Sequence, residues 1–210
     1  MKYGMMQKAM WLTFKGTYRN ALVSVLHIQN PTEIMRESHK RYKEILNNVN
    51  DFAKGDRFYI NILSCAMFAS VMLSLDELPS LEDATTYYQT AMDENFFMRF
   101  SATHSNSYTE KGRNELKERA EKSEKWYKEN PYTWVFRVED GETINQYTAT
   151  FTTCGILKLM QELHLEHLTP ALCRYDYNMA VMNNTKFTRD FTLAEGGKFC
   201  DCHYDHRERR

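Results

Sequence analysis

The sequence lacks the features that mark nucleic-acid binders and membrane-spanning proteins. Its 210 residues carry a formal net charge of −1, whereas nucleic-acid binders usually have a basic surplus. We therefore expect no nucleic-acid partner. The longest apolar run, 58–75, contains Asn61, Ser64, Ser70 and Ser74. Such a run predicts a buried helix rather than a membrane span, so we also expect no membrane partner.

Secretory and nucleotide-binding signals are missing as well. The first residues have no apolar region ahead of a small-residue cleavage site, so we expect no signal peptide. There are only five cysteines, an odd number without the spacing of a disulfide framework, which favours free thiols in a reducing cytoplasm. No GxxxxGK[ST], GxGxxG, GxSxG or HExxH motif is present. We therefore expect a soluble globular protein whose function does not depend on these nucleotide-binding, serine-hydrolase or metalloprotease motifs.

The first 130 residues are predicted to be mainly helical. Asn30, Pro31 and Glu33 have the order of an N-cap, a first-turn proline and a capping-box acid. A helix capped by Ser80 is expected to continue through the aromatic stretch 87–97, which would be core or interface, so a homo-oligomer stays open. The stretch from Ser101 to Gly112 is rich in Ser, Thr, Asn and His and predicts a mobile loop or lid. A charged helix is expected over 114–128.

The second half changes to an alternation typical of strands. Residues 132–151 are predicted to form a hairpin around Asp140-Gly141. One helix is expected from a Thr153 cap to residue 165 and another over 169–182. A second hairpin, 186–204, turns at Glu195-Gly196-Gly197. Hairpin, two helices and hairpin over 131–206 predict an antiparallel sheet, so the chain is predicted to be one α+β domain over 1–210.

Two segments carry side chains suited to chemistry. Cys173 and Asp176 lie three apart on a predicted helix and should project to the same side. Cys154 lies at a predicted helix start, where the helix dipole favours a thiolate nucleophile. The alternative for Cys154 is a buried residue at a strand–helix junction. Arg189 is either a carboxylate clamp or a solvated strand arginine.

The last predicted strand alternates two sets of side chains. Cys200, Cys202 and Tyr204 should share one face, and Asp201 and His203 the other. The cysteines with His203 and the following histidine suggest a zinc site, but a Cys-x-Cys pair on a strand fits a tetrahedral ion poorly. The alternative is edge-strand histidines that face water. We expect no metal and no cofactor.

Taken together, these segments resemble the C-terminal signature of the L-2-amino-thiazoline-4-carboxylic acid hydrolase family. The resemblance covers about residues 145–205 well, and the helical half matches in general character only. Each piece is weak alone and the combination is fairly specific. The matching residues are Thr153-Cys154, Cys173-x2-Asp176, Phe187-x-Arg189-x2-Thr192-Leu-Ala-Glu195-Gly196-Gly197 and Cys200-Asp201.

The resemblance implies a hydrolase of cysteine metabolism that acts on the carbon–nitrogen bond of a cyclic amidine. Water would add to the ring carbon between sulfur and nitrogen, and the ring of a small thiazoline carboxylic acid would open to N-carbamoyl-cysteine. Cys173 or Cys154 would be the nucleophile, or would shape the pocket if water attacks directly. Asp176 would be the general base or the amidinium partner. The substrate-binding residues would be Arg189, which holds the carboxylate, and Thr192, Glu195, Cys200 and Asp201.

One departure and two rival interpretations accompany this resemblance. After Cys200-Asp201 the family tends to place an aromatic residue, whereas Cys202-His203 follows here, so substrate choice could differ. A more remote resemblance to 4-vinyl reductase-type domains implies a non-catalytic module that binds or senses a small molecule. The remaining interpretation is a thiol or zinc protein that uses the C-terminal cysteines and histidines.

Overall fold

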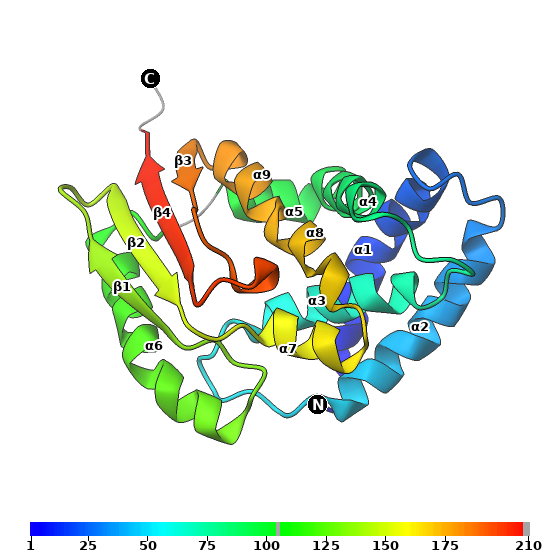
Figure 1. The fold of residues 1–210 in the computed structure, drawn as a ribbon, viewed down its shortest axis with the longest axis horizontal. Coiled ribbons are helices and arrows are strands. Elements are labelled where there is room, and N and C mark those ends of the chain that lie inside the picture. The colour runs from blue at the N-terminus through cyan, green and yellow to red at the C-terminus, as the bar shows by residue number, and fades with distance from the viewer. Residues whose placement is uncertain (104–105, 208–210) are drawn as a thin grey trace.

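Helices build the N-terminal part of the molecule. The computed structural model describes residues 1–103 and 106–207. The helical prediction for residues 1–130 is confirmed. In Figure 1 the helices up to residue 102 lie together, whereas the helix that begins at Glu110 lies beside the sheet. The helices of this part are α1 (Met5–Ser24), α2 (Pro31–Asn48), α3 (Tyr59–Met72), α4 (Leu81–Asp93), α5 (Phe96–Ala102) and α6 (Glu110–Glu129).

Helix α3 forms the centre of the main hydrophobic core. Every residue from Ile62 to Met72 is buried, and α1, α2 and α7 (Gly155–Glu162) pack around the helix. A helix that is apolar on all sides is stable only when protein surrounds it, so the prediction of a buried helix is confirmed. Cys65 lies fully inside this core. None of the described helices combines the length and apolar content that a membrane crossing requires.

Local capping chemistry explains two helix boundaries. Ser80 caps α4 as predicted, because its Oγ accepts a hydrogen bond from the Asp83 backbone N–H at 3.1 Å. The prediction that this helix continues through Phe97 is wrong. Asn95 begins a new helix, α5, by accepting hydrogen bonds from the backbone N–H groups of Phe97 and Met98. An asparagine that bonds its own backbone in this way favours a helix start over a helix interior.

The start of α2 agrees with the prediction in position but not in detail. The helix begins at Pro31 behind an Asn30 N-cap, but the Asn30 side chain makes no capping hydrogen bond. The Glu33 carboxylate pairs with Arg36 at 3.1 Å instead of reaching back to the N-cap. The predicted capping box is therefore wrong.

The sheet contains both predicted hairpins. Strands β1 (Phe136–Asp140) and β2 (Gln146–Phe151) form the first, and β3 (Thr185–Thr188) and β4 (Cys200–His206) form the second. The four strands are antiparallel in the order β1-β2-β4-β3, so the hairpins join through β2 and β4. The α+β class is therefore confirmed (Figure 1). Helix α6 packs against β1, and α9 (Tyr175–Met182) packs against β3.

The two faces of β4 differ as the alternation predicts. Cys202 lies opposite Ala149 of β2, and Tyr204 lies opposite Tyr147. These side chains pack with Ala180 of α9 in a second, smaller core. On the opposite face, the exposed His203 ring lies 2.8 Å from the Thr148 hydroxyl. One covered face and one solvated face are usual for antiparallel sheets.

The connection between the hairpins is helical, with two corrections. Thr153 does not cap α7: its hydroxyl accepts a hydrogen bond from the Val135 N–H at 2.7 Å. Cys154 is the N-cap, and its Sγ accepts a hydrogen bond from the Leu157 N–H at 3.4 Å. The single helix predicted over 169–182 is two helices, α8 (Thr169–Cys173) and α9, which meet at Arg174.

The aromatic stretch predicted as core or interface divides between core and surface. Tyr87 and Tyr88 of α4 are buried, whereas Phe96, Phe97 and Phe100 of α5 are exposed. A homo-oligomer stays a prediction. Of the predicted loop 101–112, residues 104–105 lie outside the described residues; Ser101 belongs to α5 and Glu110 begins α6. A lid function also stays a prediction.

Candidate functional site

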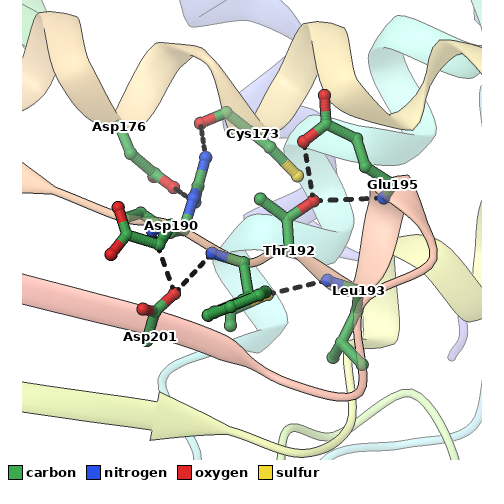
Figure 2. A network of polar contacts seen from close by, with 10 residues as sticks. Cys173, Asp176, Asp190, Thr192, Leu193, Glu195 and Asp201 are labelled. Carbon is green, nitrogen blue, oxygen red and sulfur yellow. Dashed lines mark hydrogen bonds and ion pairs between the residues drawn. The ribbon is translucent and has the colours of Figure 1, made fainter.

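The centre of the site is an ion pair between the loop after β3 and the helix junction. The Arg189 Nη1 donates to the Asp176 Oδ2 at 2.8 Å, and its Nη2 donates to the Cys173 carbonyl oxygen at 3.0 Å. The Arg189 side chain is only 5% exposed. Dashed lines in Figure 2 mark these contacts to the Asp176 carboxylate and to Cys173. One arginine therefore connects the loop to the last residue of α8 and the first turn of α9.

Arg189 lies just beyond the end of β3, although the sequence predicts that the strand reaches it. Its guanidinium carbon still lies 5.4 Å from the ring centroid of Phe187 and 5.8 Å from that of Tyr177. Aromatic rings on this side restrict the guanidinium to the interior. The guanidinium already donates hydrogen bonds to Asp176 and to a backbone carbonyl oxygen. Binding of a substrate carboxylate by Arg189 therefore stays a prediction.

Asp201 anchors the loop from the opposite face of β4. Its Oδ1 accepts hydrogen bonds from the backbone N–H groups of Asp190 and Phe191 at 3.2 and 2.7 Å. Its other carboxylate oxygen lies 3.6 Å from the His203 ring. The carboxylate therefore holds the residues that follow Arg189 (Figure 2). A substrate contact by Asp201 stays a prediction.

Thr192 and Glu195 interact with each other in the turn before β4. The Thr192 hydroxyl accepts from the Glu195 N–H at 3.1 Å and donates to the Glu195 carboxylate at 3.3 Å. Gly196 has φ +85°, where a side chain would be strained. A Cβ on Gly197 would lie 2.7 Å from the Thr192 carbonyl oxygen. Glycine is therefore required at both positions, and the predicted substrate contacts of Thr192 and Glu195 stay predictions.

Four thiols surround the ion pair and influence one another electrostatically. The Cys200 Sγ accepts a hydrogen bond from the Leu193 N–H at 3.2 Å, and the Cys173 thiol points from the helix toward the same loop (Figure 2). Burial raises the pKa of Cys154 to about 11 and that of Cys202 to about 12. Burial also raises the pKa of Cys173 and Cys200. All four thiols are therefore protonated near neutral pH, and burial outweighs the helix-start effect expected for Cys154.

Asp176 combines burial with access to open space. Burial raises the pKa of its carboxyl, and the Arg189 guanidinium opposes this effect without cancelling it. The side chain is nevertheless 34% exposed, because it lines two cavities. Among the described residues no hydrogen bond reaches its Oδ1. One carboxylate oxygen is thus fixed by Arg189, and the other is available to a ligand.

The larger of these cavities, the sheet cavity, has a volume of about 260 Å³. It lies between α5, α9 and the sheet, and its walls combine aromatic, aliphatic and polar side chains. The stacked rings of Tyr147 and Tyr204, with centroids 4.6 Å apart, form one wall. The lining residues are Met98, Ser101, Tyr108, Tyr147, Asp176, Met179, Ala180, Asn183, Thr185 and Tyr204.

The smaller helix cavity has a volume of about 110 Å³ and is walled by helices and mainly apolar side chains. The hydroxyl groups of Ser64 and Tyr88 lie 2.9 Å apart in its wall. Met98, Asp176 and Met179 line both cavities, so Asp176 lies where the two meet. The full lining comprises Met10, Ile60, Asn61, Ser64, Tyr88, Met92, Met98, Ile156, Leu172, Tyr175, Asp176 and Met179.

The structure brings some predicted site residues together and separates others. Arg189 contacts the Asp176 carboxylate and the backbone carbonyl oxygen of Cys173, and Cys154 and Cys200 lie near enough to affect the pKa of Cys173. No cysteine is among the described residues that line the two cavities.

A zinc site receives no support from the geometry. Cys202 faces the small core, whereas His203 faces solvent on the other side of β4. Within 1–103 and 106–207, no group of three or more His, Cys, Asp or Glu side chains is arranged to hold a metal ion.

Several lining residues were not identified from the sequence. Tyr204 shares a strand face with the cysteines, and that alternation was a usable signal. Tyr108 lies in the predicted loop, where its hydroxyl is 3.0 Å from the Thr185 hydroxyl. Ser64 and Tyr88 belong to helices that the sequence predicts to pack in the core. Nothing in the sequence distinguishes these two residues from ordinary core residues.

Comparison with known protein families gives a match. A family model described as L-2-amino-thiazoline-4-carboxylic acid hydrolase matches residues 61–204. The match covers more than half of the chain and includes Asp176, Arg189 and the surrounding thiols. Comparisons with curated proteins and with solved structures give no match.

Proposed function

The chain belongs to the L-2-amino-thiazoline-4-carboxylic acid hydrolase family. We propose that it opens a 2-amino-thiazoline ring by adding water to ring carbon 2, with Asp176 as the base. The family's description supports a hydrolase. The observation that carries the specific proposal is the Asp176 carboxyl, held by Arg189 at 2.8 Å where two cavities meet. For the family substrate, the product is N-carbamoyl-cysteine.

The reaction balances without a co-reactant other than water. In the protonated substrate the ring nitrogen already carries a proton. The water oxygen bonds to ring carbon 2 as one water proton passes to Asp176, and the carbon–nitrogen double bond becomes a single bond because its electron pair moves to the ring nitrogen. The carbon–sulfur bond then breaks, carbon 2 becomes the urea carbonyl as its hydroxyl proton is released to solvent, and the sulfur leaves as a thiol with the proton that Asp176 held. The carbon–nitrogen bond is thus the one that water attacks, and the carbon–sulfur bond is the one that breaks.

Asp176 has the properties that this chemistry needs. A protonated 2-amino-thiazoline is a planar amidinium-like cation, and a carboxylate oxygen is its natural partner. The pKa raised by burial also makes the carboxylate a stronger base toward the attacking water. We assign both roles to Asp176, with the free Oδ1 directed to the ligand and Oδ2 held by Arg189.

Arg189 is assigned as a positioning residue in this mechanism. Its guanidinium is almost fully buried and its two terminal nitrogens are engaged. It fixes the rotamer of Asp176 and limits the rise of the Asp176 pKa. This differs from the role of substrate carboxylate clamp expected from the sequence.

Water, rather than a cysteine, is the proposed nucleophile. A thiol attacks as the thiolate, and the raised pKa values of Cys154 and Cys173 keep both protonated near neutral pH. Neither side chain lines the cavities at Asp176. The thiols would instead shape the wall behind the ion pair.

Turnover of 2-amino-thiazoline-4-carboxylate by the purified protein tests this proposal, with N-carbamoyl-cysteine detected by mass spectrometry. We expect ring opening by the wild type, loss of activity in Asp176→Asn, and activity within about tenfold of wild type in Cys173→Ala and Cys154→Ala. Activity that survives Asp176→Asn, or that disappears with either cysteine, contradicts the assignment.

A second candidate is a non-catalytic module that binds or senses a small molecule, similar to 4-vinyl reductase-type domains. It is favoured by one observation: the two cavities expose Asp176 but no thiol from the described residues. Binding of a thiazoline to wild type without any ring opening would support this candidate over the hydrolase.

A further inference from the structure

The walls of the sheet and helix cavities have one electrostatic property in common. Among the described residues that line them, Asp176 is the only charged side chain. The other polar groups are tyrosine, serine and threonine hydroxyls and the amides of Asn61 and Asn183. A ligand in these cavities therefore meets one negative charge and aromatic faces.

Two buried arginines close to the sheet cavity are already engaged. Arg189 is bonded to Asp176 and to the Cys173 carbonyl oxygen. Arg113 lies behind the wall, 4.3 Å from the Tyr147 ring centroid, and bonds Asp140 at 2.8 Å. Neither arginine lines the sheet cavity or the helix cavity, so neither offers its guanidinium to an anion bound there.

This charge distribution favours a cation over an anion. A ligand carboxylate placed beside Asp176 would add a second negative charge without a positive partner, which is unfavourable in a partly buried site. An amidinium gains the Asp176 carboxylate, and the faces of Tyr147 and Tyr204 stabilise positive charge as well. The amidine end of a thiazoline therefore fits the site better than its carboxylate end.

The helix cavity is suited to an apolar group. Its volume of about 110 Å³ is somewhat smaller than the roughly 150 Å³ of an apolar cavity that binds benzene. Flexible thioethers from Met10, Met92, Met98 and Met179 line it and adapt to different shapes. The Ser64 and Tyr88 hydroxyl groups bond each other, so an alkyl group beside this pair would leave neither hydroxyl without a partner.

We propose that this chain acts on cationic cyclic amidines that carry a short alkyl arm at ring carbon 4 in place of a carboxylate. The amidinium would lie against Asp176 in the sheet cavity, and the arm would pass Met98 and Met179 into the helix cavity. This substrate class rests on the hydrolase function proposed above. Water adds at carbon 2 and the carbon–sulfur bond breaks as before, and the product is an N-substituted urea with a free thiol.

Calorimetric binding of a ligand series tests the substrate class separately from catalysis. The probes are 2-amino-thiazoline, its 4-methyl, 4-ethyl and 4-propyl derivatives, and the 4-carboxylate. We expect affinity to rise about three- to fourfold with each methylene, and the carboxylate to bind at least about tenfold more weakly than the 4-methyl compound. Tighter binding of the carboxylate, or no dependence on alkyl length, overturns the inference.

A filled helix cavity provides a matched pair of variants. Ile156→Phe adds bulk to the wall of that cavity, and Ile144→Phe makes the same change at an exposed isoleucine outside both cavities. We expect the ratio of 4-propyl to unsubstituted affinity to fall to about one in Ile156→Phe and to stay at the wild-type value in Ile144→Phe. A ratio that is unchanged in Ile156→Phe overturns the placement of the arm.

Parallel turnover measurements separate the two proposals. The expected affinity order with no ring opening of any probe supports the ligand class and overturns the hydrolase function. Ring opening of the carboxylate together with its tighter binding supports the hydrolase function and overturns the ligand class.

Discussion

Two buried arginines in this molecule make nearly the same contacts, but one belongs to a structural contact and the other to the candidate functional site. Arg113 of α6 and Arg189 after β3 have side chains 3% and 5% exposed, and each donates to an aspartate at 2.8 Å. Each also donates to backbone carbonyl oxygens and lies against an aromatic ring. The arginines alone therefore do not distinguish a structural contact from a chemical site.

The difference lies in the two carboxylates. Asp140 is 49% exposed at the end of β1, and hydrogen bonds from Lys117 and Arg113 lower its pKa. Asp176 lies where two cavities meet, pairs with Arg189, and has its pKa raised by burial. A carboxylate with two cations near water stabilises the fold, whereas one that is desolvated and faces a cavity is suited to proton transfer and cation binding.

Replacement of each aspartate tests this comparison with the largest expected effect. Asp176→Asn should lower kcat for thiazoline ring opening by about 10²- to 10⁴-fold, because it removes the proposed base. Asp140→Asn should leave kcat within about threefold of wild type. Steady-state kinetics on both variants checks this, and similar losses in the two variants would remove the distinction.

Replacement of each arginine sharpens the comparison through stability. Arg189→Met and Arg113→Met should each lower the free energy of unfolding by about 3 kcal/mol, because a buried pair loses one partner and several hydrogen bonds are broken. Urea denaturation monitored by circular dichroism measures both. A loss well below 1 kcal/mol in either variant would contradict the tight structural role of that arginine.

The pH dependence of catalysis separates the two arginines more finely. Arg189 opposes the rise of the Asp176 pKa, so Arg189→Gln should move the acidic limb of kcat/KM to higher pH, by about one to three units. The sign follows because the base must be ionised, and a higher pKa delays ionisation as pH rises. Arg113→Gln should leave the limb in place. A downward shift in Arg189→Gln would contradict the assignment.

The pH dependence of stability should have opposite signs at the two aspartates, with a small amplitude. The folded-state pKa of Asp140 is lowered. Its stabilising contribution to the free energy of unfolding is therefore present above the unfolded-state pKa and is lost as pH falls through the folded-state pKa. The folded-state pKa of Asp176 is raised. Its stabilising contribution to the free energy of unfolding is therefore present below the unfolded-state pKa and is lost as pH rises through the folded-state pKa.

Urea unfolding of wild type and the two asparagine variants between about pH 3 and pH 7 measures these signs. The stability of wild type relative to Asp140→Asn should increase with pH. The stability of wild type relative to Asp176→Asn should decrease with pH. Equal signs would show that one of the two pKa directions is wrong.

The sequence predicts the fold well because its signals are local. Apolar periodicity, the Ser80 cap and the turn at Asp140-Gly141 locate helices and hairpins without tertiary information. Where local signals compete, the prediction fails. The sequence places Asn95 inside a continuous helix, but its side chain accepts hydrogen bonds from the backbone and begins a new helix. Thr153 and Cys154 are adjacent cap candidates, and pairing with Val135 occupies the threonine.

The site is less predictable because its properties depend on burial and on contacts between distant elements. Spacing alone unites Cys173 with Asp176, and strand alternation identifies the inner face of β4. The raised pKa of Asp176, the engaged guanidinium of Arg189 and the bonds from Asp201 to the backbone of the loop require the folded molecule. Ser64 and Tyr88 reach the helix cavity through helix packing that no local pattern records.

Direct titration of the Asp176 carboxyl tests the central claim. Carbon-13 NMR of aspartate-labelled protein, with Asp176→Asn used to assign the signal, follows its pKa with and without 2-amino-thiazoline. We predict that the free protein shows a pKa above the ordinary range and that the bound amidinium lowers it. A carboxyl that titrates at or below its ordinary value, or that does not respond to the ligand, would contradict the account.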